Sequence, residues 1–409
     1  MSVPNKNKII NDPLHGFLTI PTGLIYDLIQ HPYFQRLRRI RQLGMSEWVY
    51  PGATHTRFHH ALGAMNLMLM AMDTLRKKGI EISDEEYQAT AIAILLHDIG
   101  HGPYSHTLEH TLIQEVQHEE ISINIMNKLN KEFNGEMDLA IKIFQDKYVE
   151  KPFLSQLISG QLDMDRLDYL LRDSFYTGVS EGIVGGERII NMLNVSDGNL
   201  VVEEKGIYSV EKFLVARRLM YWQVYLHKTV IAADALLISI LNRARELAHV
   251  GHSLGSYHPL LHFLLNDISR ENFDDEALQL FLALDDIDIM SSVKLWQFHE
   301  DKILSTLSQS LINRNLPKVL ISKEPMSETN VEDAVSLTIE KLKITENDAR
   351  RYFIKYGLLE NHAYKSEGGG IRIMNKHGQV YDVAEISDNY NLTALKETVK
   401  KYYLLKWVK

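Results

Sequence analysis

Apolar side chains recur at helical spacing from about Thr22 to Val250. Leu24, Ile25, Leu28 and Ile29 follow the i, i+1, i+4, i+5 pattern, which is typical of a helix with one buried face. Further helices are expected, in chain order, over residues 32–43, 57–78 and 84–97, and the Gly-rich turn at 100–103 should end the last of them.

The expected helix that begins at Pro32 carries an unusual number of cations. Leu37 and Ile40 are expected to face inward because their spacing matches one side of a helix. The remaining surface would then be occupied by the arginines at 36, 38, 39 and 41.

Strand signals are confined to two parts of the chain. The sequence NLVVEEKGIYSV at 199–210 follows Asp197-Gly198 and alternates well enough to predict two short strands. Two long helices should then run from Tyr208 to Ala248. After Pro325 we expect a short helix (331–342), another that starts near Thr345, and Gly-linked strands within 366–386.

The sequence thus predicts a mainly α fold, in which a helical core with a small β-hairpin spans 1–325 and an α+β subdomain spans 326–409. The chain has 45% hydrophobic and 24% charged residues, which is ordinary for a globular protein. It has no apolar run near the roughly 20 residues that span a bilayer, and its start lacks the layout of a signal peptide. We therefore expect a cytoplasmic protein without a membrane partner.

Charge and cysteine content narrow the chemistry. The net charge of −9 argues against a general nucleic-acid binder, which usually carries a basic surplus. The absence of cysteine excludes disulfides and thiolate metal sites, so a bound metal must use histidine and carboxylate ligands. No GxxxxGK[ST] motif is present, so phosphates are not expected to bind a P-loop.

Histidines cluster between His55 and His118. The pair His97-Asp98 stands at the end of a helix that Ala91, Ile94 and Leu95 are expected to bury. Two adjacent residues can both bind one ion only if the helix stops there. Buried hydrogen-bonding histidines are an equally good explanation of this pair alone. Four candidate ligands on three helices favour a divalent ion, with Mg, Mn, Fe, Zn and Ni not distinguished.

The segment DMDRLDYLLRD at 163–173 supports this interpretation. Asp165, Tyr169 and Asp173 share one helix stripe, where a carboxylate and a ring could serve as a metal ligand and a platform for a sugar or base. The other stripe contains Leu167, Leu170 and Leu171. Taken alone, the segment would rather indicate a solvated face in which the acids pair with Arg166 and Arg172.

Two further groups are candidates for phosphate chemistry. His106 and Glu109 lie three residues apart, so the carboxylate could orient the imidazole as a general acid, and His118 could act similarly unless it is a surface residue. A mixed stripe of Arg217, Tyr221, Tyr225 and Lys228 could grip a polyphosphate and a ribose, or could form a helix–helix contact.

Five stretches in the first half of the chain resemble one known family: KIINDPLHG (8–16), FQRLRRIRQLG (34–44), VYPGATHTRFHHALG (49–63), LLHDIGHGPYSH (95–106) and DMDRLDYLLRD (163–173). The order H…HD…D resembles the HD superfamily of metal phosphohydrolases. More narrowly, the chain is similar to deoxynucleoside triphosphate (dNTP) triphosphohydrolases of the SAM-and-HD-domain type. Such enzymes let water attack the α-phosphorus, which releases a deoxynucleoside and inorganic triphosphate.

This resemblance implies roles for individual residues. The implied metal ligands are His60, His97, Asp98 and Asp165, with His60 rather than His59 matching the family motif. His106 matches the catalytic histidine, with Glu109 as its partner and His118 lining the site. The implied substrate-binding residues are Gln42 and Leu43, which would face the sugar, and Arg57, Arg166, Tyr169, Asp173, Arg217 and Tyr225.

The resemblance also implies an oligomer, a tetramer in preference to a dimer, activated by a nucleotide bound between subunits. The positions that match the activator site are Lys8, Ile9, Asn11, Gln35 and Arg38. Gln30 replaces an acidic residue that reads guanine in relatives, which argues against guanine-specific activation. We expect no N-terminal SAM domain. The alternatives are an HD hydrolase of another nucleotide or a phosphomonoester, and a nucleotide-sensing or nucleic-acid-binding oligomer with little turnover.

Overall fold

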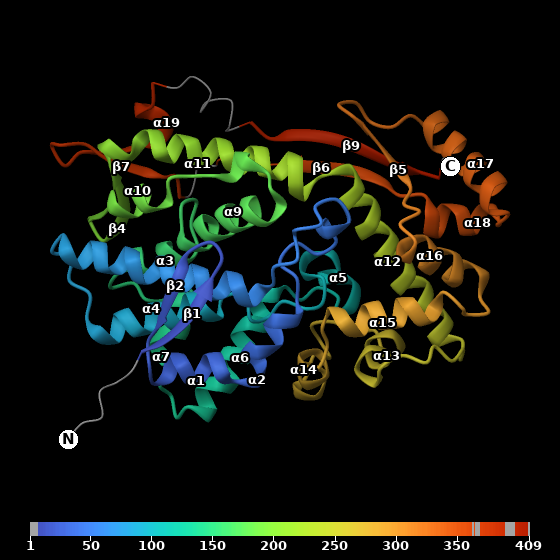
Figure 1. Ribbon diagram of the computed structural model, residues 1–409, viewed down its shortest axis with the longest axis horizontal. Helices are drawn as coiled ribbons and strands as arrows, with labels where there is room; N and C mark the ends of the chain where they lie inside the picture. Colours follow the sequence, from blue (N-terminus) through green and yellow to red (C-terminus); the bar gives the residue numbers. More distant parts are fainter. Residues whose placement is uncertain (1–6, 362–363, 365–368, 389–396, 408–409) are drawn as a thin grey trace.

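A computed structural model of the chain describes residues 7–361, 364, 369–388 and 397–407, and these are mainly helical (Figure 1). The described helices are α1 (Leu24–Gln30), α2 (Pro32–Gln35), α3 (Arg57–Lys77), α4 (Asp84–Leu96), α5 (Glu109–Leu112), α6 (His118–Glu132), α7 (Asp138–Phe144), α8 (Pro152–Ile158), α9 (Met164–Thr177), α10 (Gly186–Asn191), α11 (Ile207–Met220), α12 (Lys228–His249), α13 (His258–Leu265), α14 (Asp275–Leu282), α15 (Asp286–Trp296), α16 (Lys302–Ile312), α17 (Glu328–Leu342), α18 (Glu346–Asp348) and α19 (Val383–Ile386).

The described strands form three small sheets. They are β1 (Lys8–Asp12), β2 (Gly16–Ile20), β3 (Leu193–Ser196), β4 (Asn199–Glu203), β5 (Lys318–Ser322), β6 (Tyr356–Asn361), β7 (Arg372–Met374), β8 (Val380–Asp382) and β9 (Val399–Lys406). β1 pairs with β2, the second sheet has the order β3-β4-β7-β8, and the third has the order β5-β9-β6. The fold class predicted from the sequence, mainly α with small β elements, is confirmed.

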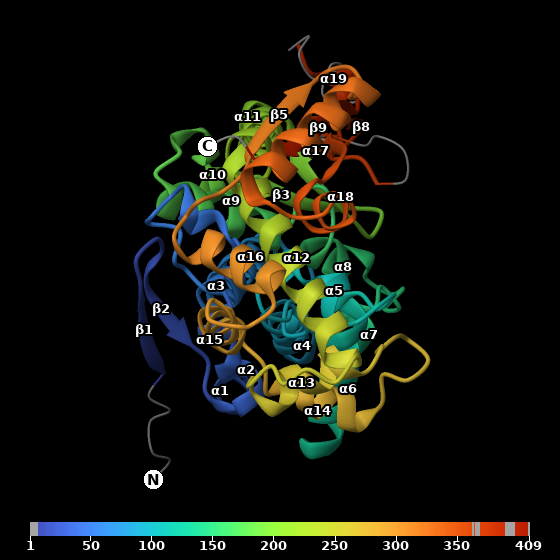
Figure 2. The same cartoon turned by 90° about the vertical axis from the view of Figure 1, so that its right-hand side faces the viewer.

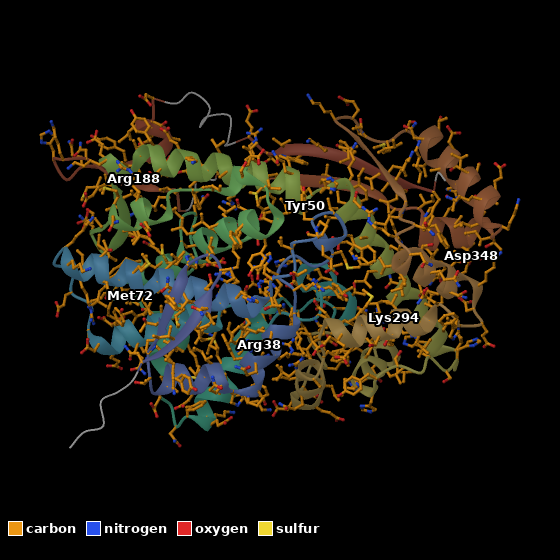
Figure 3. The ribbon with its side chains drawn as sticks, in the orientation of Figure 1. Arg38, Tyr50, Met72, Arg188, Lys294 and Asp348 are labelled. Carbon is orange, nitrogen blue, oxygen red and sulfur yellow. The ribbon has the colours of Figure 1, made fainter. Side chains whose placement is uncertain are left out.

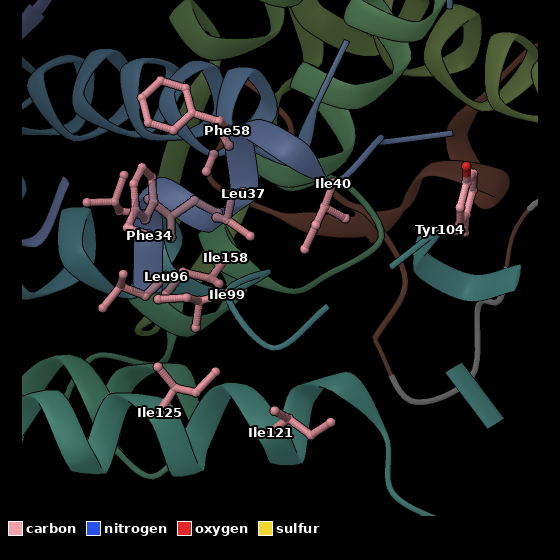
Figure 4. Packing of buried hydrophobic residues seen from close by; sticks show 14 of the residues in the cluster. Phe34, Leu37, Ile40, Phe58, Leu96, Ile99, Tyr104, Ile121, Ile125 and Ile158 are labelled. Carbon is pink, nitrogen blue, oxygen red and sulfur yellow. The ribbon is translucent and has the colours of Figure 1, made fainter. Parts of the chain in front are cut away.

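Three helices, α3, α4 and α9, form the centre of the first half of the chain, with α4 also packed on α7 (Figures 1 and 2). Local sequence fixes where two of them begin. The side chain of Ser83 accepts a hydrogen bond from Glu86 N at the start of α4, and Asp163 accepts one from Arg166 N at the start of α9. The last turn of α4 and the residues that follow it pack on a buried apolar core, where Figure 4 shows Leu96 and Ile99 near Phe34.

The helix expected over 32–43 is much shorter than predicted. α2 covers Pro32–Gln35, a 3₁₀ turn (η1, Arg36–Arg39) follows, and Ile40 is already extended. Arg36 is not on the surface, because its guanidinium is buried and donates to the backbone carbonyls of Leu284, Ile99 and His101. The periodic pattern could not show these distant acceptors, which hold the segment in its tight turn.

The prediction of two strands within 199–210 is half confirmed, because β4 is one of them but its partner β3 precedes the predicted segment. β3 and β4 pair across Asp197 and Gly198, both of which have positive φ as a tight turn requires. The second of the two strands expected within 199–210 is wrong, because the chain turns at Gly206 into α11. A Cβ at Gly206 would lie 2.7 Å from a side-chain carbon of Val202, so the chain passes too close to β4 for a larger residue. The two long helices predicted after it are confirmed as α11 and α12.

The last part of the chain is tied to what precedes it. α17 confirms the predicted helix near 331–342, and β7 and β8 confirm strands within 366–386, of which residues 366–368 lie outside the described residues. β7 pairs in parallel with β4, and β9 pairs with β5, which precedes Pro325. The division of the chain at 325/326 stays a prediction.

No single described helix is both long and apolar enough to cross a membrane. The bent pair Glu204–Tyr225 and Lys228–His249, whose two halves meet at 55°, passes that test on length and composition.

Candidate metal centre and phosphate cavity

Three helices bring the four predicted metal ligands together. His60 lies in the first turn of α3, His97 and Asp98 directly follow α4, and Asp165 lies in the first turn of α9. His60 Nε2 is 3.3 Å from His97 Nε2 and 3.0 Å from Asp165 Oδ1. Asp98 places its two carboxylate oxygens 3.6 Å from His60 Nε2 and 3.4 Å from His97 Nε2.

These separations fit one cation shared by the four side chains. Metal–ligand bonds of about 2.0–2.2 Å at angles of about 90–110° place ligand atoms about 2.8–3.6 Å apart. His60, His97 and Asp165 form a group whose ligand atoms all lie within 4.8 Å of one another. The residues present therefore suit a divalent ion with imidazole and carboxylate ligands.

The second nitrogen of each imidazole supports the same interpretation. His60 Nδ1 lies 2.8 Å from Asp168 Oδ2, and His97 Nδ1 lies 2.6 Å from the carbonyl of Ile94. Because each of these partners accepts a hydrogen bond, each Nδ1 carries a proton, and each Nε2 is the atom that faces the cluster and would bind a cation in place of a proton. The two Nε2 atoms lie 3.3 Å apart, a separation that suits two ligands of one cation.

Asp168 is the residue behind the metal that sequence reasoning missed. It is fully buried and lies 2.6 Å from His15 Nε2, and it accepts two hydrogen bonds from Arg172, which also donates to Asp12. Gly63 allows this arrangement, because a Cβ there would lie 2.1 Å from Asp168 Oδ1. The i, i+4 spacing of Asp168 and Arg172 was the available signal, but it also fits a solvated pair.

The charges around the site favour bound cations. Burial opposes protonation of His60, but its hydrogen bonds and charge interactions with Asp165 and Asp168 raise its pKa to about 10. Burial would raise the pKa of Asp98, but the ion pair with Arg57 and the nearby His97 hold it well below the usual range. Hydrogen bonds to His60 and His97 lower the pKa of Asp165 in the same way against its burial. The carboxylates are therefore charged and available to a metal at neutral pH.

His59 and His60 are adjacent in sequence but make different contacts. His59 Nδ1 accepts a hydrogen bond from the backbone N–H of Thr56 and so caps the start of α3. His60 is fully buried in the metal cluster. The structure therefore places His60, and not His59, among the predicted ligands.

A second histidine cluster lies beside the metal site. His106 Nδ1 is 3.0 Å from Glu109 Oε2, and His118 Nδ1 is 2.6 Å from Glu109 Oε1, so the three predicted acid–base residues are brought together. The hydrogen bonds from His106 and His118 hold the pKa of Glu109 well below its usual range although burial opposes this. The carboxylate stays charged and orients both imidazoles.

His101 completes this cluster and was not predicted. It is buried, its ring centroid lies 3.8 Å from that of His118 and 4.9 Å from that of His106, and its Nδ1 lies 3.4 Å from Asp98 Oδ1. Burial, followed by the charge of Arg57, lowers its pKa well below the usual value, so His101 is neutral at pH 7. Its position four residues after His97 was visible in the sequence, but nothing there separated it from a structural histidine.

The two clusters face one cavity with a volume of about 550 Å³. Six of the eight predicted substrate residues line it, namely Gln42, Leu43, Arg57, Tyr169, Asp173 and Tyr225. Asp173 is fixed by His55 at 2.8 Å and by the hydroxyl of Tyr225 at 2.7 Å. His55 was not predicted, although it lies five residues before His60, because nothing in the sequence showed that it contacts Asp173 in the wall of the site.

The other two predicted substrate residues lie outside the lining of this cavity. Arg166 pairs with Asp163, at 3.1 Å. Arg217 lies one helical turn before Tyr221, with its guanidinium 6.0 Å from the ring centroid. Of the predicted stripe along α11, Tyr221 and Tyr225 face the cavity from a π-helical turn at Tyr221–Tyr225, which interrupts the regular helix between α11 and α12.

The positions predicted to bind an activator lie in two groups. Lys8, Ile9 and Asn11 belong to β1, where the side chain of Ile9 is 66% exposed. Gln35 and Arg38 lie next to each other at the end of α2 and in η1, where Arg38 donates to Gln35 and its guanidinium lies 3.6 Å from the ring centroid of Phe58. Their role stays a prediction.

Comparisons with known proteins agree with this geometry. Residues 57–173 match the model of the HD domain, and residues 184–251 match that of the HD associated region. An uncharacterized protein of Bacillus subtilis, YwfO, is 36% identical over 77% of this chain and 73% of its own length. A crystal structure of a phosphohydrolase from Bacteroides thetaiotaomicron is 53% identical, covers 98% of this chain and 100% of its own, and superimposes with a TM-score of 0.95.

More distant relatives carry a named activity. The deoxynucleoside triphosphate triphosphohydrolase SAMHD1 homolog of Dictyostelium discoideum is 29% identical over 61% of this chain, and the SAMHD1 enzyme of Bos taurus is 27% identical over 61%. The matched region spans about half the length of these two relatives, 51% and 50%. The chain belongs to the HD-domain family of phosphohydrolases, with a histidine–aspartate cluster able to hold a divalent metal.

Proposed function

We propose that this protein hydrolyses deoxynucleoside triphosphates to the deoxynucleoside and inorganic triphosphate. The single observation that carries the proposal is the shared cavity, in which a candidate metal cluster and a carboxylate-oriented histidine pair face the same space. The named activity of the distant relatives supports the choice of substrate.

The residues divide the chemistry between them. A divalent cation held by His60, His97, Asp98 and Asp165 would activate water and neutralise phosphate charge. Glu109 binds Nδ1 of His106, which leaves Nε2 of that ring to hand a proton to the departing 5′-oxygen of the deoxynucleoside.

The far wall of the cavity suits a sugar. Asp173 and the hydroxyl of Tyr225 form one hydrogen-bonded edge, and the ring of Tyr169 lies 6.3 Å from that of Tyr225. Gln42 Oε1 is buried and has no hydrogen-bond partner among the described residues, so it can accept a bond from a sugar hydroxyl. Leu43 beside it would leave a 2′-hydroxyl without a polar partner, which favours deoxyribose.

The proposal extends to regulation and location. A nucleotide bound near Lys8, Asn11 and Arg38, between subunits of a tetramer, would activate the enzyme, and the protein would act in the cytoplasm. The exposure of β1 supports a contact there with another molecule. Size-exclusion chromatography with light scattering, with and without each dNTP, tests this extension, because nucleotide-driven assembly would shift the mass.

A product assay tests the central proposal. The chain is incubated with each dNTP, each NTP or p-nitrophenyl phosphate in Mg²⁺ or Mn²⁺, and the products are separated by anion exchange. Triphosphate from dNTPs alone is the expected result. Release of orthophosphate or of another nucleotide product would indicate a different HD phosphohydrolase, and no product from any compound would indicate a sensor.

A further inference from the structure

The turn that carries His106 has an uncommon backbone. Tyr104 and Ser105, the two residues before it, both have positive φ, 54° and 51°. Side chains larger than hydrogen disfavour this left-handed region, so two such residues in succession persist only where the surroundings hold them. The side chain of His106 is 65% exposed, and its Nδ1 lies 3.0 Å from Oε2 of Glu109.

The N-terminal end of α15 supplies one of the restraints. Asp286 is buried, and each of its carboxylate oxygens accepts one backbone hydrogen bond: Oδ1 from Tyr104 N at 2.7 Å and Oδ2 from Arg41 N at 2.9 Å. One side chain thus joins the His106 turn to the segment that leads into the cavity residues Gln42 and Leu43. In Figure 3, Lys294 marks the same helix, α15, two turns further along.

Other elements hold the remaining residues of the turn. Ser105 Oγ donates to the carbonyl of Arg41 and accepts from Arg57 Nε, each at 2.9 Å. On the other side of His106, Thr107 Oγ1 donates to Asp234 of α12 at 2.9 Å. The fit is close, because a Cβ at Gly44 would lie 2.8 Å from Thr107 Oγ1. The backbone on both sides of His106 is therefore fixed, whereas its ring projects into the cavity.

We propose that Asp286 is a positioning residue that acts through His106, by holding the Tyr104-Ser105 turn in its left-handed conformation. The proposal rests on the proposed function for the role of His106 as the proton donor. Among the described residues, the hydrogen bonds of the Asp286 carboxylate go to Tyr104 N and Arg41 N and not to the histidine clusters, so its effect on His106 would be transmitted through the backbone of the turn.

Asp286→Asn changes the hydrogen-bonding capacity of the side chain while it keeps nearly the same size and shape. The asparagine keeps one oxygen, but its NH₂ group would face a backbone N–H, so either Tyr104 or Arg41 loses its acceptor. The control is Asp288→Asn, which removes a carboxylate two residues further along α15, where the side chain accepts a hydrogen bond from Asp285 N rather than from the His106 turn.

A double-mutant cycle measures whether Asp286 acts through His106. In the wild-type background, Asp286→Asn should lower kcat for dNTPs by about 10- to 100-fold with little change in KM, because a small misplacement of a reacting group has effects of this size. In the His106→Ala background, the same change should lower kcat by less than about two-fold. Equal losses in both backgrounds would overturn the proposal, and so would an equal loss with Asp288→Asn.

Amide hydrogen exchange tests the same proposal without turnover. The peptide that contains Tyr104–Thr107 should exchange at least about ten-fold faster in Asp286→Asn than in Asp288→Asn. Unchanged exchange would overturn the proposal. If the wild-type chain consumes no dNTP, the proposed function fails, and the exchange rates still decide whether Asp286 holds the turn.

Discussion

The two histidine clusters that share the cavity differ in how firmly their rings are held. At the metal site, His60 and His97 are buried and have their outer nitrogens bound by Asp168 and the carbonyl of Ile94. In the second cluster, which contains His106, Glu109 and His118, the ring of His106 is mostly exposed and contacts the carboxylate of Glu109. A metal ligand must keep its lone pair on one point, whereas a proton donor must reach a substrate that arrives from solvent.

The way each cluster is supported differs too. Helix ends hold the candidate metal ligands, since His60 lies in the first turn of α3, Asp165 lies in the first turn of α9, and His97 and Asp98 follow α4. A strained turn holds His106, and its stability depends on contacts from α12 and α15. We therefore expect substitutions at the first cluster to remove the metal and substitutions at the second to alter turnover alone.

The largest effect is expected from His60→Ala. Loss of a buried ligand should lower kcat by at least about 1,000-fold, because the cation supplies several kcal/mol of transition-state stabilisation. The neighbouring His59→Ala is the control, since His59 caps α3 and should change stability by about 1 kcal/mol with little effect on turnover. Steady-state kinetics and thermal melts of both variants check this, and equal loss of activity would contradict the separation of tasks.

His106→Ala should lower kcat by about 100- to 10,000-fold, the usual range for loss of a general acid. The exposed His110, four residues later in α5, provides a control substitution in the same segment. With p-nitrophenyl triphosphate, in which p-nitrophenolate replaces the 5′-oxygen and leaves without a proton, His106→Ala should recover much of the lost rate relative to the wild type on the same compound. No recovery would show that His106 is not the proton donor.

Asp168→Asn should weaken the metal site without removing a ligand. Loss of an outer partner typically lowers metal affinity by about 10- to 100-fold. The change also breaks a buried pair with Arg172, so the free energy of unfolding should fall by about 3–5 kcal/mol. Metal titration and urea unfolding measure the two effects, and an affinity equal to that of the wild type would mean that Asp168 serves the fold alone.

The smallest expected effect concerns pH. Burial raises the pKa of Asp234 to about 7, against the hydrogen bond from Thr107. Between about pH 4 and pH 7 the folded protein keeps a proton that the unfolded chain has released, so the free energy of unfolding falls as pH rises and the loss is complete above about 7. Asp234→Asn has no such proton, so its Tm should fall less than that of the wild type between pH 5 and pH 8. An identical fall in both proteins would show that Asp234 does not titrate there.

The sequence predicted correctly those features that local spacing determines, namely helices with an apolar face and polar side chains at their ends. The segments around His60, His97 and Asp165 carry polar side chains at helix ends, and both the mainly α fold and the long helices α11 and α12 follow from apolar periodicity. The choice between His59 and His60 came from the family motif, and the capping contact of His59 gives the physical reason for it.

The failures have a common cause. Arg36 looked like a surface residue, and Asp168 was passed over, because the partners that bury them are far away in sequence: Leu284 for Arg36, and His15 and Gly63 for Asp168. The second strand expected within 199–210 failed for the same reason, since a close approach to β4 turns the chain at Gly206. Local patterns predict elements, whereas burial of a charge depends on tertiary neighbours.

Metal content directly tests whether His60, His97, Asp98 and Asp165 bind one ion. Wild type, Asp165→Ala and His106→Ala are purified in parallel, loaded with Mn²⁺, dialysed, and measured by inductively coupled plasma mass spectrometry. We expect about one ion per chain in wild type and His106→Ala, and at least about a ten-fold lower content in Asp165→Ala. An Asp165→Ala protein that folds and retains as much metal as the wild type would contradict the proposed four-ligand site.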